Sequence, residues 1–400
     1  MSELSRPRLA RVAEVALLPC DEGPLRHVLR HPEVPGSCLR LGDAEAGLAL
    51  ALDGTRDLDE LMGATRRAIG TDGPALMVRL LAELGDRGLL EGMAPQQPSD
   101  HVPLGLLARL ARPRTWSFRR APAAIDRLHR RGGRLLLTLP ALVVIVAVAS
   151  AGLAATVALV AQGGAQPLTV GGRLGLGALC FLAARALLVA AHEIAHGLAL
   201  AETGHRVGAA GVRLLAVFPY AFVDTSPVWL EPRKRRMAVT AAGPLSDLTI
   251  AGAAAIAALA TGGELRDVCF QVCLAGYLAA LLNLNPCLPR DGYHLLCEAL
   301  RRPDLRESAV ADLQRRLAGR RGPEGPRVLI AYGVSVVVWG VVGASLATAM
   351  AAHALPALRA ALPSGVSLPI LLVVWTLLLA PTAMLVGRPL WLRRVGARSS

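Results

Sequence analysis

Ala191-His192-Glu193-Ile194-Ala195-His196-Gly197 places an HExxH pattern inside an apolar run that begins near Leu174 and continues to about Leu200. On a helix the two histidines lie one turn apart on the same face, with the glutamate beside them. This arrangement gives Zn²⁺ two imidazole ligands and leaves a carboxylate to act as a general base. The alternative is a chance match, but ionisable groups in a membrane helix are costly and usually functional. The stretch therefore predicts a zinc site within a membrane helix.

The composition agrees with a membrane protein, because 53% of the 400 residues are hydrophobic. Six apolar runs are each about as long as a helix that crosses roughly 30 Å of hydrocarbon. They cover residues 135–161, 174–201, 237–261, 268–286, 328–352 and 367–387. We expect a mainly α fold, a six-helix polytopic membrane protein with a small N-terminal winged-helix-like α/β domain.

The charge is distributed unevenly along the chain. Residues 1–95 carry eleven arginines against fifteen acidic residues, although the whole chain has a net charge of +13. Between spans one and two, three and four, and five and six, the basic residues are only Arg173, Arg266 and Arg359. The positive-inside rule then predicts cytosolic N- and C-termini in the inner (plasma) membrane. That rule explains the basic excess better than nucleic-acid binding, so we expect no nucleic-acid partner.

Residues 1–95 indicate a small soluble module. The predicted strands are Glu14–Leu18 and Ser37–Leu41, the predicted helices begin at Gly42, Asp57 and Gly73, and a closing wing strand is predicted at Arg87–Glu91. Asp57 and Glu60 have the spacing of a capping box, and Pro74 suits the first turn of the third helix. Three helices with flanking strands favour a winged-helix fold.

The rest of the chain divides into three further parts. Residues 96–134 form a linker rich in arginine with interleaved leucines, Trp116 and Phe118, typical of an interfacial helix on anionic lipid. Residues 135–388 form the membrane domain, and residues 389–400 a cytosolic tail. Within the membrane domain, residues 212–217 and 220–223 could form a hairpin that docks an extended substrate, or an ordinary interfacial loop. Residues 303–327 predict a basic amphipathic surface helix.

A catalytic zinc site needs a third protein ligand besides the two histidines. The candidates near the same membrane boundary are His205, Asp224, Asp247, Asp291 and His294. Asp291 is the best placed, because Pro286 and Pro289 free the backbone to turn and Gly292 permits a close approach.

The motif pair resembles that of site-2-protease-type intramembrane metalloproteases. HExxH on one span is followed on a later span by Asn283-x-x-Pro286 and Asp291-Gly292. Within that family, the chain is similar to the branch of bacterial peptide-maturation proteases. This similarity is carried by Phe222-Val223-Asp224-Thr225-Ser226 and Ala242-Gly243-Pro244. The resemblance, which covers about residues 135–300, implies zinc held by His192, His196 and Asp291.

The same resemblance implies that Glu193 serves as general base and acid. We assign substrate contacts to Asn283, Asp224 and Asp247. Asp247 departs from the family, which usually carries an asparagine there, and an acid at this place could alter substrate contacts or hydration near the zinc.

The N-terminal module resembles the PqqD-like modules that bind leader peptides in ribosomal peptide maturation. The similarity is carried by Cys38–Leu41 and by the stretch Leu52–Leu61. It implies that a leader peptide binds as an added strand. DNA binding is a rival, but a net-negative module lacks the required charge. A plain cytosolic domain that steadies the membrane part is the other alternative.

Together these features predict a zinc endopeptidase that removes the leader from a ribosomally made precursor peptide, with an exporter or a modifying enzyme as a further partner. The enzymatic alternative is cleavage of a membrane-anchored regulator. A non-catalytic zinc-containing chaperone, export or immunity component is the alternative from another class. A metal permease is less favoured, because the sequence shows no internal repeat.

Overall fold

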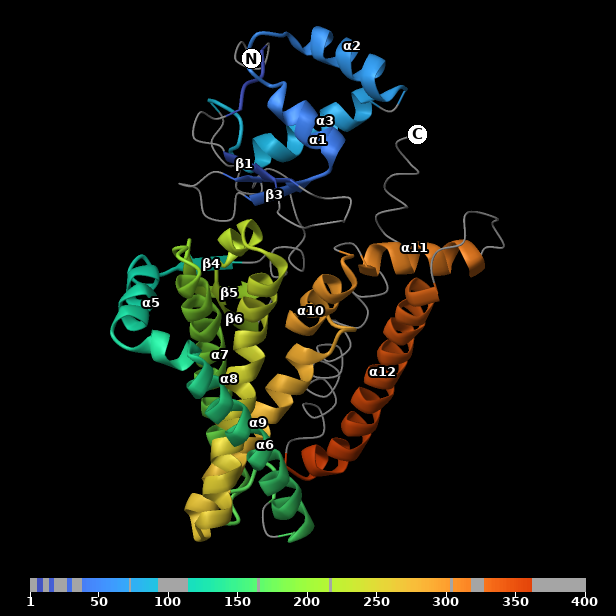
Figure 1. The fold of residues 1–400 in the computed structure, drawn as a ribbon. Helices are drawn as coiled ribbons and strands as arrows, with labels where there is room; N and C mark the ends of the chain where they lie inside the picture. Colours follow the sequence, from blue (N-terminus) through green and yellow to red (C-terminus); the bar gives the residue numbers. More distant parts are fainter. Residues whose placement is uncertain are drawn as a thin grey trace. The chain divides into compact units, whose positions relative to one another are not determined.

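A computed structural model describes residues 6–9, 14–17, 27–30, 38–71, 73–92, 114–163, 166–215, 218–302, 305–317 and 327–361 of the chain. The protein is mainly helical and divides into two compact units, Met1–Leu284 and Asn285–Ser400 (Figure 1). Five helices within the described residues are long and apolar enough to cross a membrane. The sixth predicted span, residues 367–387, and the predicted tail lie outside the described residues.

The N-terminal module begins with a three-stranded antiparallel sheet of order β1-β2-β3. Its strands are β1 (Glu14–Leu17), β2 (His27–Arg30) and β3 (Cys38–Leu41). Strands β1 and β3 agree with the sequence prediction, whereas β2 was missed. With four residues, β2 is too short for its alternation to stand out. Because β2 lies in the middle, β3 is an edge strand of this sheet within the described residues.

Three helices follow the sheet and cover its core. They are α1 (Asp43–Leu50), α2 (Leu58–Ile69) and α3 (Gly73–Asp86). The predicted capping box of α2 is confirmed, because the Glu60 N–H donates to Asp57 and the Asp57 N–H donates to Glu60. Leu29, Leu61 and Met77 are fully buried between helices and sheet.

The wing strand predicted at Arg87–Glu91 is reduced to an isolated bridge between Leu9 and Leu90. The cause is the end of α3. Gly88 adopts a positive φ of 67°, and the Leu89 N–H donates to the carbonyl of Leu84. These residues close the helix, so they are not free to extend as a strand.

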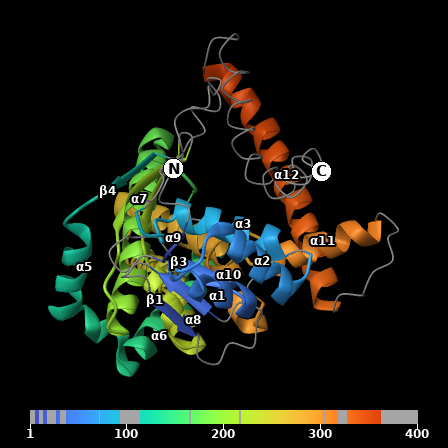
Figure 2. The same ribbon diagram turned by 90° about the horizontal axis from the view of Figure 1, so that it is seen from above.

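Four long helices of the first unit pack side by side (Figure 2). They are α6 (Leu139–Ala161), α7 (Leu174–Glu202), α8 (Arg233–Ala260) and α9 (Gly263–Leu284). Glycine allows their backbones to approach, since a Cβ on Gly152 of α6 would lie 2.0 Å from the Cα of Gly252 in α8. Small residues at such contacts are usual between membrane helices. The bounds agree closely with the first four predicted spans.

A second sheet lies in the connections of this bundle, with the order β4-β5-β6. Strands β5 (Ala210–Leu215) and β6 (Phe218–Val223) form the hairpin predicted from the sequence. Strand β4 (Arg114–Ser117), from the basic linker, pairs with β5 and was not predicted. The linker also forms the expected helix, α5 (Ala121–Arg130), and a short 3-10 helix η2 (Gly133–Leu137) that leads into α6.

The second unit contains α10 (Asp291–Leu300), α11 (Leu305–Leu317) and α12 (Arg327–Ala361). Helix α11 is the surface helix predicted within residues 303–327. The Tyr332 hydroxyl donates to the carbonyl of Pro286 over 2.9 Å. Buried Leu305 and Tyr293 belong to the same core cluster as Tyr332. Helix α12 corresponds to the fifth predicted span but is longer than predicted.

Candidate metal centre

Helix α7 carries His192, Glu193 and His196 in its C-terminal half, as the HExxH pattern predicts. Because four residues make about one turn, both imidazoles project from the same face. Their exposed fractions are only 7% and 9%. The two Nε2 atoms lie 3.1 Å apart, with the rings nearly perpendicular at 83°. The histidines therefore form a converging pair within the helix bundle.

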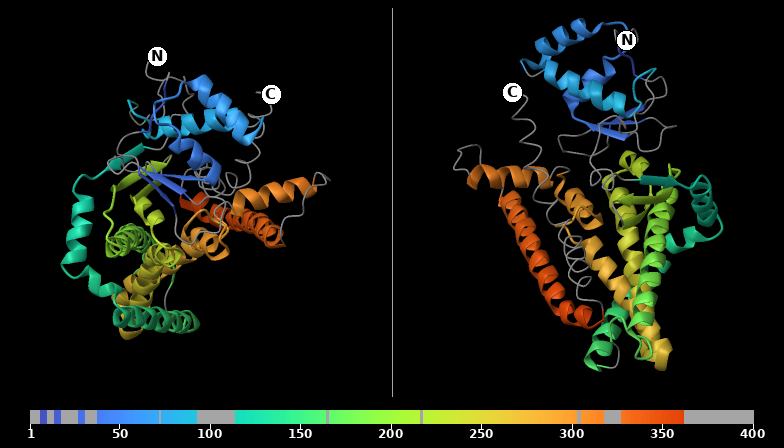
Figure 3. Two further views of the ribbon diagram at one scale, coloured as in Figure 1. Left: turned by 45° about the horizontal axis from the view of Figure 1, so that its top comes forward. Right: turned by 180° about the vertical axis from the view of Figure 1, so that it is seen from behind.

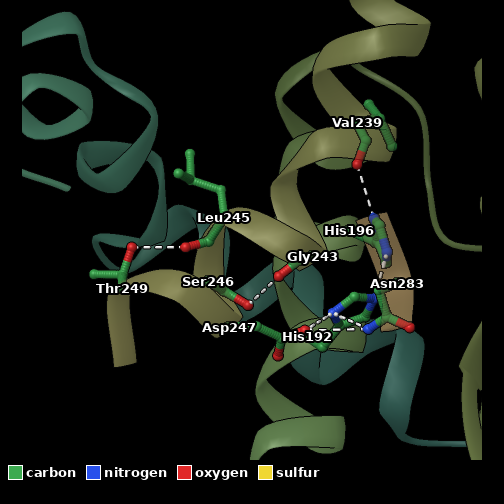
Figure 4. A network of polar contacts seen from close by, with 9 residues as sticks. All are labelled: His192, His196, Val239, Gly243, Leu245, Ser246, Asp247, Thr249 and Asn283. Atoms are coloured by element: carbon green, nitrogen blue, oxygen red, sulfur yellow. Dashed lines mark hydrogen bonds and ion pairs between the residues drawn. The ribbon is translucent and has the colours of Figure 1, made fainter. Parts of the chain in front are cut away.

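Partners on α8 determine which nitrogen of each ring carries the hydrogen (Figure 4). His196 Nδ1 lies 2.7 Å from the carbonyl oxygen of Val239, which can only accept, so Nδ1 donates. His192 Nδ1 lies 2.8 Å from Oδ2 of Asp247, a carboxylate that likewise accepts. In neutral rings both Nε2 atoms then carry lone pairs that face each other. This arrangement is repulsive until a cation accepts both lone pairs, so it fits a metal ion.

Asp247, on α8, contacts the imidazole of His192 and is only 1% exposed. Its Oδ2 accepts from His192 Nδ1 and also from the side-chain amide of Asn283, 3.1 Å away. Its Oδ1 has no hydrogen-bond partner in the described part of the chain. A buried carboxylate that is incompletely hydrogen-bonded is costly unless positive charge lies nearby. Asp247 thus favours a cation at the imidazole that it contacts.

This position bears on the substrate contacts predicted for Asp247 and Asn283. Both side chains reach the Nδ1 side of His192, on the far side of the ring from Nε2. In metalloenzymes a carboxylate at that place holds the ligand ring and increases its basicity. Direct contact of either residue with a substrate stays a prediction.

Gly243 in α8 has no side chain, so the space next to the two imidazoles stays open. A Cβ at this position would lie 2.4 Å from His196 Nε2 and 2.5 Å from His192 Nε2. Any side chain would therefore fill the place toward which both lone pairs point. The Ser246 hydroxyl donates to the carbonyl of Gly243 over 2.7 Å, which supports the backbone in a turn where Pro244 lacks an N–H.

Asp291, the first residue of α10, joins the histidines as a candidate ligand. One ligand atom from each of His192, His196 and Asp291 lies within 4.8 Å of the other two. Two nitrogens and one carboxylate oxygen make up a donor set used by catalytic zinc sites. The three residues predicted as ligands therefore meet the distance requirement for a shared ion.

Glu193 is half-buried, and its Oε2 accepts a hydrogen bond from the backbone N–H of Val223 over 2.9 Å. Val223 is the last residue of β6, so the strand ends at this carboxylate. The sequence predicted the hairpin and the glutamate separately, and the structure joins them through one hydrogen bond. The backbone group of Val223 could not have been found from sequence, because any residue there offers the same N–H.

Asp224 and His205 have other contacts. Oδ1 of Asp224 accepts from the backbone N–H of Ser226 over 3.0 Å, at the start of the 3-10 helix η3 (Ser226–Leu230). The Asp224 carboxylate therefore holds a turn beside β6, and its predicted substrate contact stays a prediction. His205 Nε2 lies 3.0 Å from Oε1 of buried Glu231. Neither residue belongs to the three-residue ligand group.

The thiol of Cys287 lies in the segment between Asn283 and Asp291 but is a poor ligand candidate. Burial raises the pKa of this thiol, and the guanidinium of Arg306 only partly opposes the shift. Metals bind the thiolate, so a raised pKa disfavours Cys287 as a ligand at neutral pH. His294, another sequence candidate, is exposed on α10 and is likewise outside the ligand group.

Comparisons of the chain with protein-family models, with curated proteins and with solved structures find no match. The function must therefore be argued from the site itself. Its described features are two convergent imidazoles, a carboxylate ligand candidate, a second carboxylate behind one imidazole, and a glutamate beside the pair. This combination can hold a divalent metal ion and move a proton next to it.

Proposed function

We propose that this chain is a membrane-embedded zinc metalloendopeptidase of the site-2-protease type. The observation that carries the proposal is the orientation of the histidine pair. Val239 and Asp247 hold both Nδ1 atoms as donors, so that both Nε2 lone pairs converge. Glu193 directly follows the first of these histidines and can supply the general base that peptide hydrolysis needs.

The proposed ligands of the zinc ion are His192, His196 and Asp291. Three protein ligands leave a fourth position of the ion open, which distinguishes a catalytic from a structural site. When bound, zinc supplies Lewis acidity toward water and the scissile carbonyl. The buried Asp247 carboxylate holds His192 in the required orientation and offsets part of the positive charge.

Glu193 is the proposed general base and acid. Its carboxylate takes a proton from the attacking water and returns it to the leaving amine. The hydrogen bond from the Val223 N–H to Oε2 limits the rotamers of Glu193. The same bond places the end of β6 next to the group that moves the proton.

The substrate is proposed to bind in an extended form along β6. Among the strands that the structure describes, β6 is at the edge of its sheet. Backbone groups alternate in direction along an antiparallel strand. The Asp224 N–H, just after β6, donates to the carbonyl of Ala209, just before β5. The N–H groups of Val223 and Ala221 therefore point to the free edge. A peptide chain could pair there and pass the carboxylate of Glu193.

The proposed substrate class is a ribosomally made precursor peptide, from which the enzyme removes the leader. Support comes from the resemblance of the N-terminal module to leader-binding modules and from its edge strand β3, to which a leader can add. Tethering a leader to this module increases the concentration of the precursor near the protease without new contacts at the site.

The proposed location is the inner membrane, with both termini in the cytosol. Helices α6, α7, α8, α9 and the first part of α12 are long and apolar enough to cross it. The uneven distribution of arginine between the connections supports the orientation. Labelling of introduced cysteines at positions 2 and 264 in intact cells checks this, since position 264 alone should react with a membrane-impermeant reagent.

The decisive experiment compares the wild type, Glu193→Gln and His192→Ala as full-length proteins in nanodiscs. Each is incubated with the precursor peptide encoded beside it, and mass spectrometry follows the peptide. Wild type should cleave the precursor, Glu193→Gln should retain zinc without cleavage, and His192→Ala should lose both. Equal peptide maturation by wild type and Glu193→Gln would refute a hydrolytic role and favour a non-catalytic zinc protein.

A further inference from the structure

The segment from Arg114 to Leu137 combines exposed positive charge with exposed apolar side chains. It contains seven arginines, all exposed, and Asp126 is its single acidic residue. In the described part of the chain none of these arginines forms an ion pair with a carboxylate. The exposed fractions of Trp116 and Phe118 are 50% and 54%. We call this segment the basic clasp.

The helical part of the basic clasp has two different faces. In α5, Ile125 is buried, while Arg127 and Arg130 are exposed. At 100° per residue these arginines lie roughly opposite Ile125. The helix thus packs one side against the protein and turns cationic side chains outward. Figure 3 shows α5 on the outside of the bundle of α6, α7, α8 and α9.

The position of the clasp in the chain places it at the surface of a membrane. Its last element, η2, is separated from the membrane-capable helix α6 by Thr138 alone. Leu135 and Leu136 are 62% and 54% exposed, immediately before the apolar helix begins. Arginines that precede a membrane helix at this distance lie at the depth of the lipid headgroups. The complementary partner is an anionic phospholipid.

The buried side of the clasp contacts the metal-binding half of α7. A Cβ on Gly197, the residue after His196, would lie 2.9 Å from Cγ2 of Ile125. His129 Nε2 lies 2.7 Å from Oε2 of Glu202 at the end of the same helix. Ile125 also shares a core cluster with Val239, whose carbonyl accepts from His196. A shift of α5 would therefore be transmitted to the histidine that Val239 holds.

We propose that the basic clasp binds anionic phospholipid headgroups and that bound lipid restrains the C-terminal half of α7. The second part rests on the proposed function, because it makes lipid a regulator of the proposed metal site. The first part is independent of catalysis. The arginines hold the headgroups, the exposed aromatic side chains enter the interface, and Ile125 connects the clasp to Gly197.

Lipid binding is tested on the full-length Glu193→Gln protein by native mass spectrometry in detergent, with phosphatidylglycerol or phosphatidylcholine added. The triple variant Arg127→Gln, Arg130→Gln, Arg131→Gln should bind phosphatidylglycerol roughly 100-fold more weakly. Lysine at the same three positions should preserve most of the affinity. Arg56→Gln, Arg66→Gln, Arg67→Gln, which removes three exposed charges from the N-terminal module, should have little effect.

Equal binding of the two lipids, or wild-type affinity in the glutamine triple variant, would overturn the proposal. Glycerol phosphate, added as a soluble headgroup, should compete weakly. Displacement of the lipid by glycerol phosphate at equal concentration would show a phosphate site and not a membrane surface, and would also overturn it.

The connection to α7 is tested by amide hydrogen exchange in nanodiscs, again with Glu193→Gln so that turnover plays no part. When the clasp has its wild-type sequence, phosphatidylglycerol should slow exchange in residues 192–202 of α7. Ile125→Ala should still bind lipid but lose this protection, whereas the exposed-site control Leu128→Ala should keep it. Protection that is insensitive to lipid would overturn the regulatory part. If both lipid effects appear but no peptide is cleaved, the proposed protease function fails and the clasp stands.

Discussion

His192 Nδ1 donates to Oδ2 of Asp247 over 2.8 Å, from one buried side chain to another on a neighbouring helix. This bond fixes the tautomer of His192 and directs its Nε2 toward that of His196. Carboxylate partners of this kind usually increase the affinity of a histidine ligand for its metal. The bond links a buried acidic residue on α8 to the HExxH pattern on α7.

The first prediction concerns the charge of Asp247. Asp247→Leu removes both the charge and the acceptor, so zinc affinity should fall about 10- to 100-fold. Asp247→Asn keeps an acceptor without the charge, so its affinity should lie between the two. Competition with a chromophoric chelator measures the order. Thr249→Val, which removes a hydroxyl bonded only locally to the Leu245 carbonyl, is the matched control on the same helix. Equal affinities in all four proteins would contradict the role given to Asp247.

The second prediction concerns the space at Gly243. Gly243→Ala places a methyl group 2.4 Å from His196 Nε2, so zinc binding should fall by more than the roughly 100-fold typical of lost outer partners. Gly175→Ala on α7 is the control, because no atom lies within 4 Å of its added Cβ. Metal content after purification and circular dichroism separate lost binding from lost folding. A zinc-loaded Gly243→Ala protein would show that the metal does not lie between these imidazoles.

The third prediction tests peptide pairing with β6. Ala221→Pro removes an N–H that points to the free edge, and proline is tolerated on edge strands. Cleavage efficiency, kcat/KM, should fall about tenfold, the effect of one or two lost backbone hydrogen bonds. Zinc content should not change. Ala221→Val keeps the N–H and should cleave nearly normally, so a similar loss in both variants would point to the side chain and away from strand pairing.

The fourth prediction concerns removal of the metal. If zinc binds only the folded protein, a free zinc concentration of about 100 times the Kd should stabilise the protein by about 2.7 kcal/mol. Thermal unfolding in detergent should therefore occur at a lower temperature after chelation and recover when zinc is added. His192→Ala should unfold at the same temperature with and without the chelator. A wild-type protein indifferent to chelation would argue against a zinc ion held by buried ligands.

Much of the fold followed from local patterns. The helical spans are recognisable because apolar runs of membrane length have few other solutions. The boundaries of α2 and α3 follow from a capping box and from a proline in the first turn. Strands β2 and β4 were missed because four-residue strands depend on their partners more than on their own residues. The prediction of a wing strand was wrong because Gly88, with its positive φ, closes the preceding helix.

The sequence alone determined that His192, Glu193 and His196 share one turn of an apolar helix, because helical periodicity acts over neighbouring residues. It also indicated Asp291 as a third ligand, through a resemblance in motif spacing. Only the tertiary structure decided that Asp247 and the Val239 carbonyl face the two Nδ1 atoms and that Val223 meets Glu193. Such pairings join residues thirty or more positions apart, and their geometry depends on how whole helices and strands pack, which no local pattern encodes.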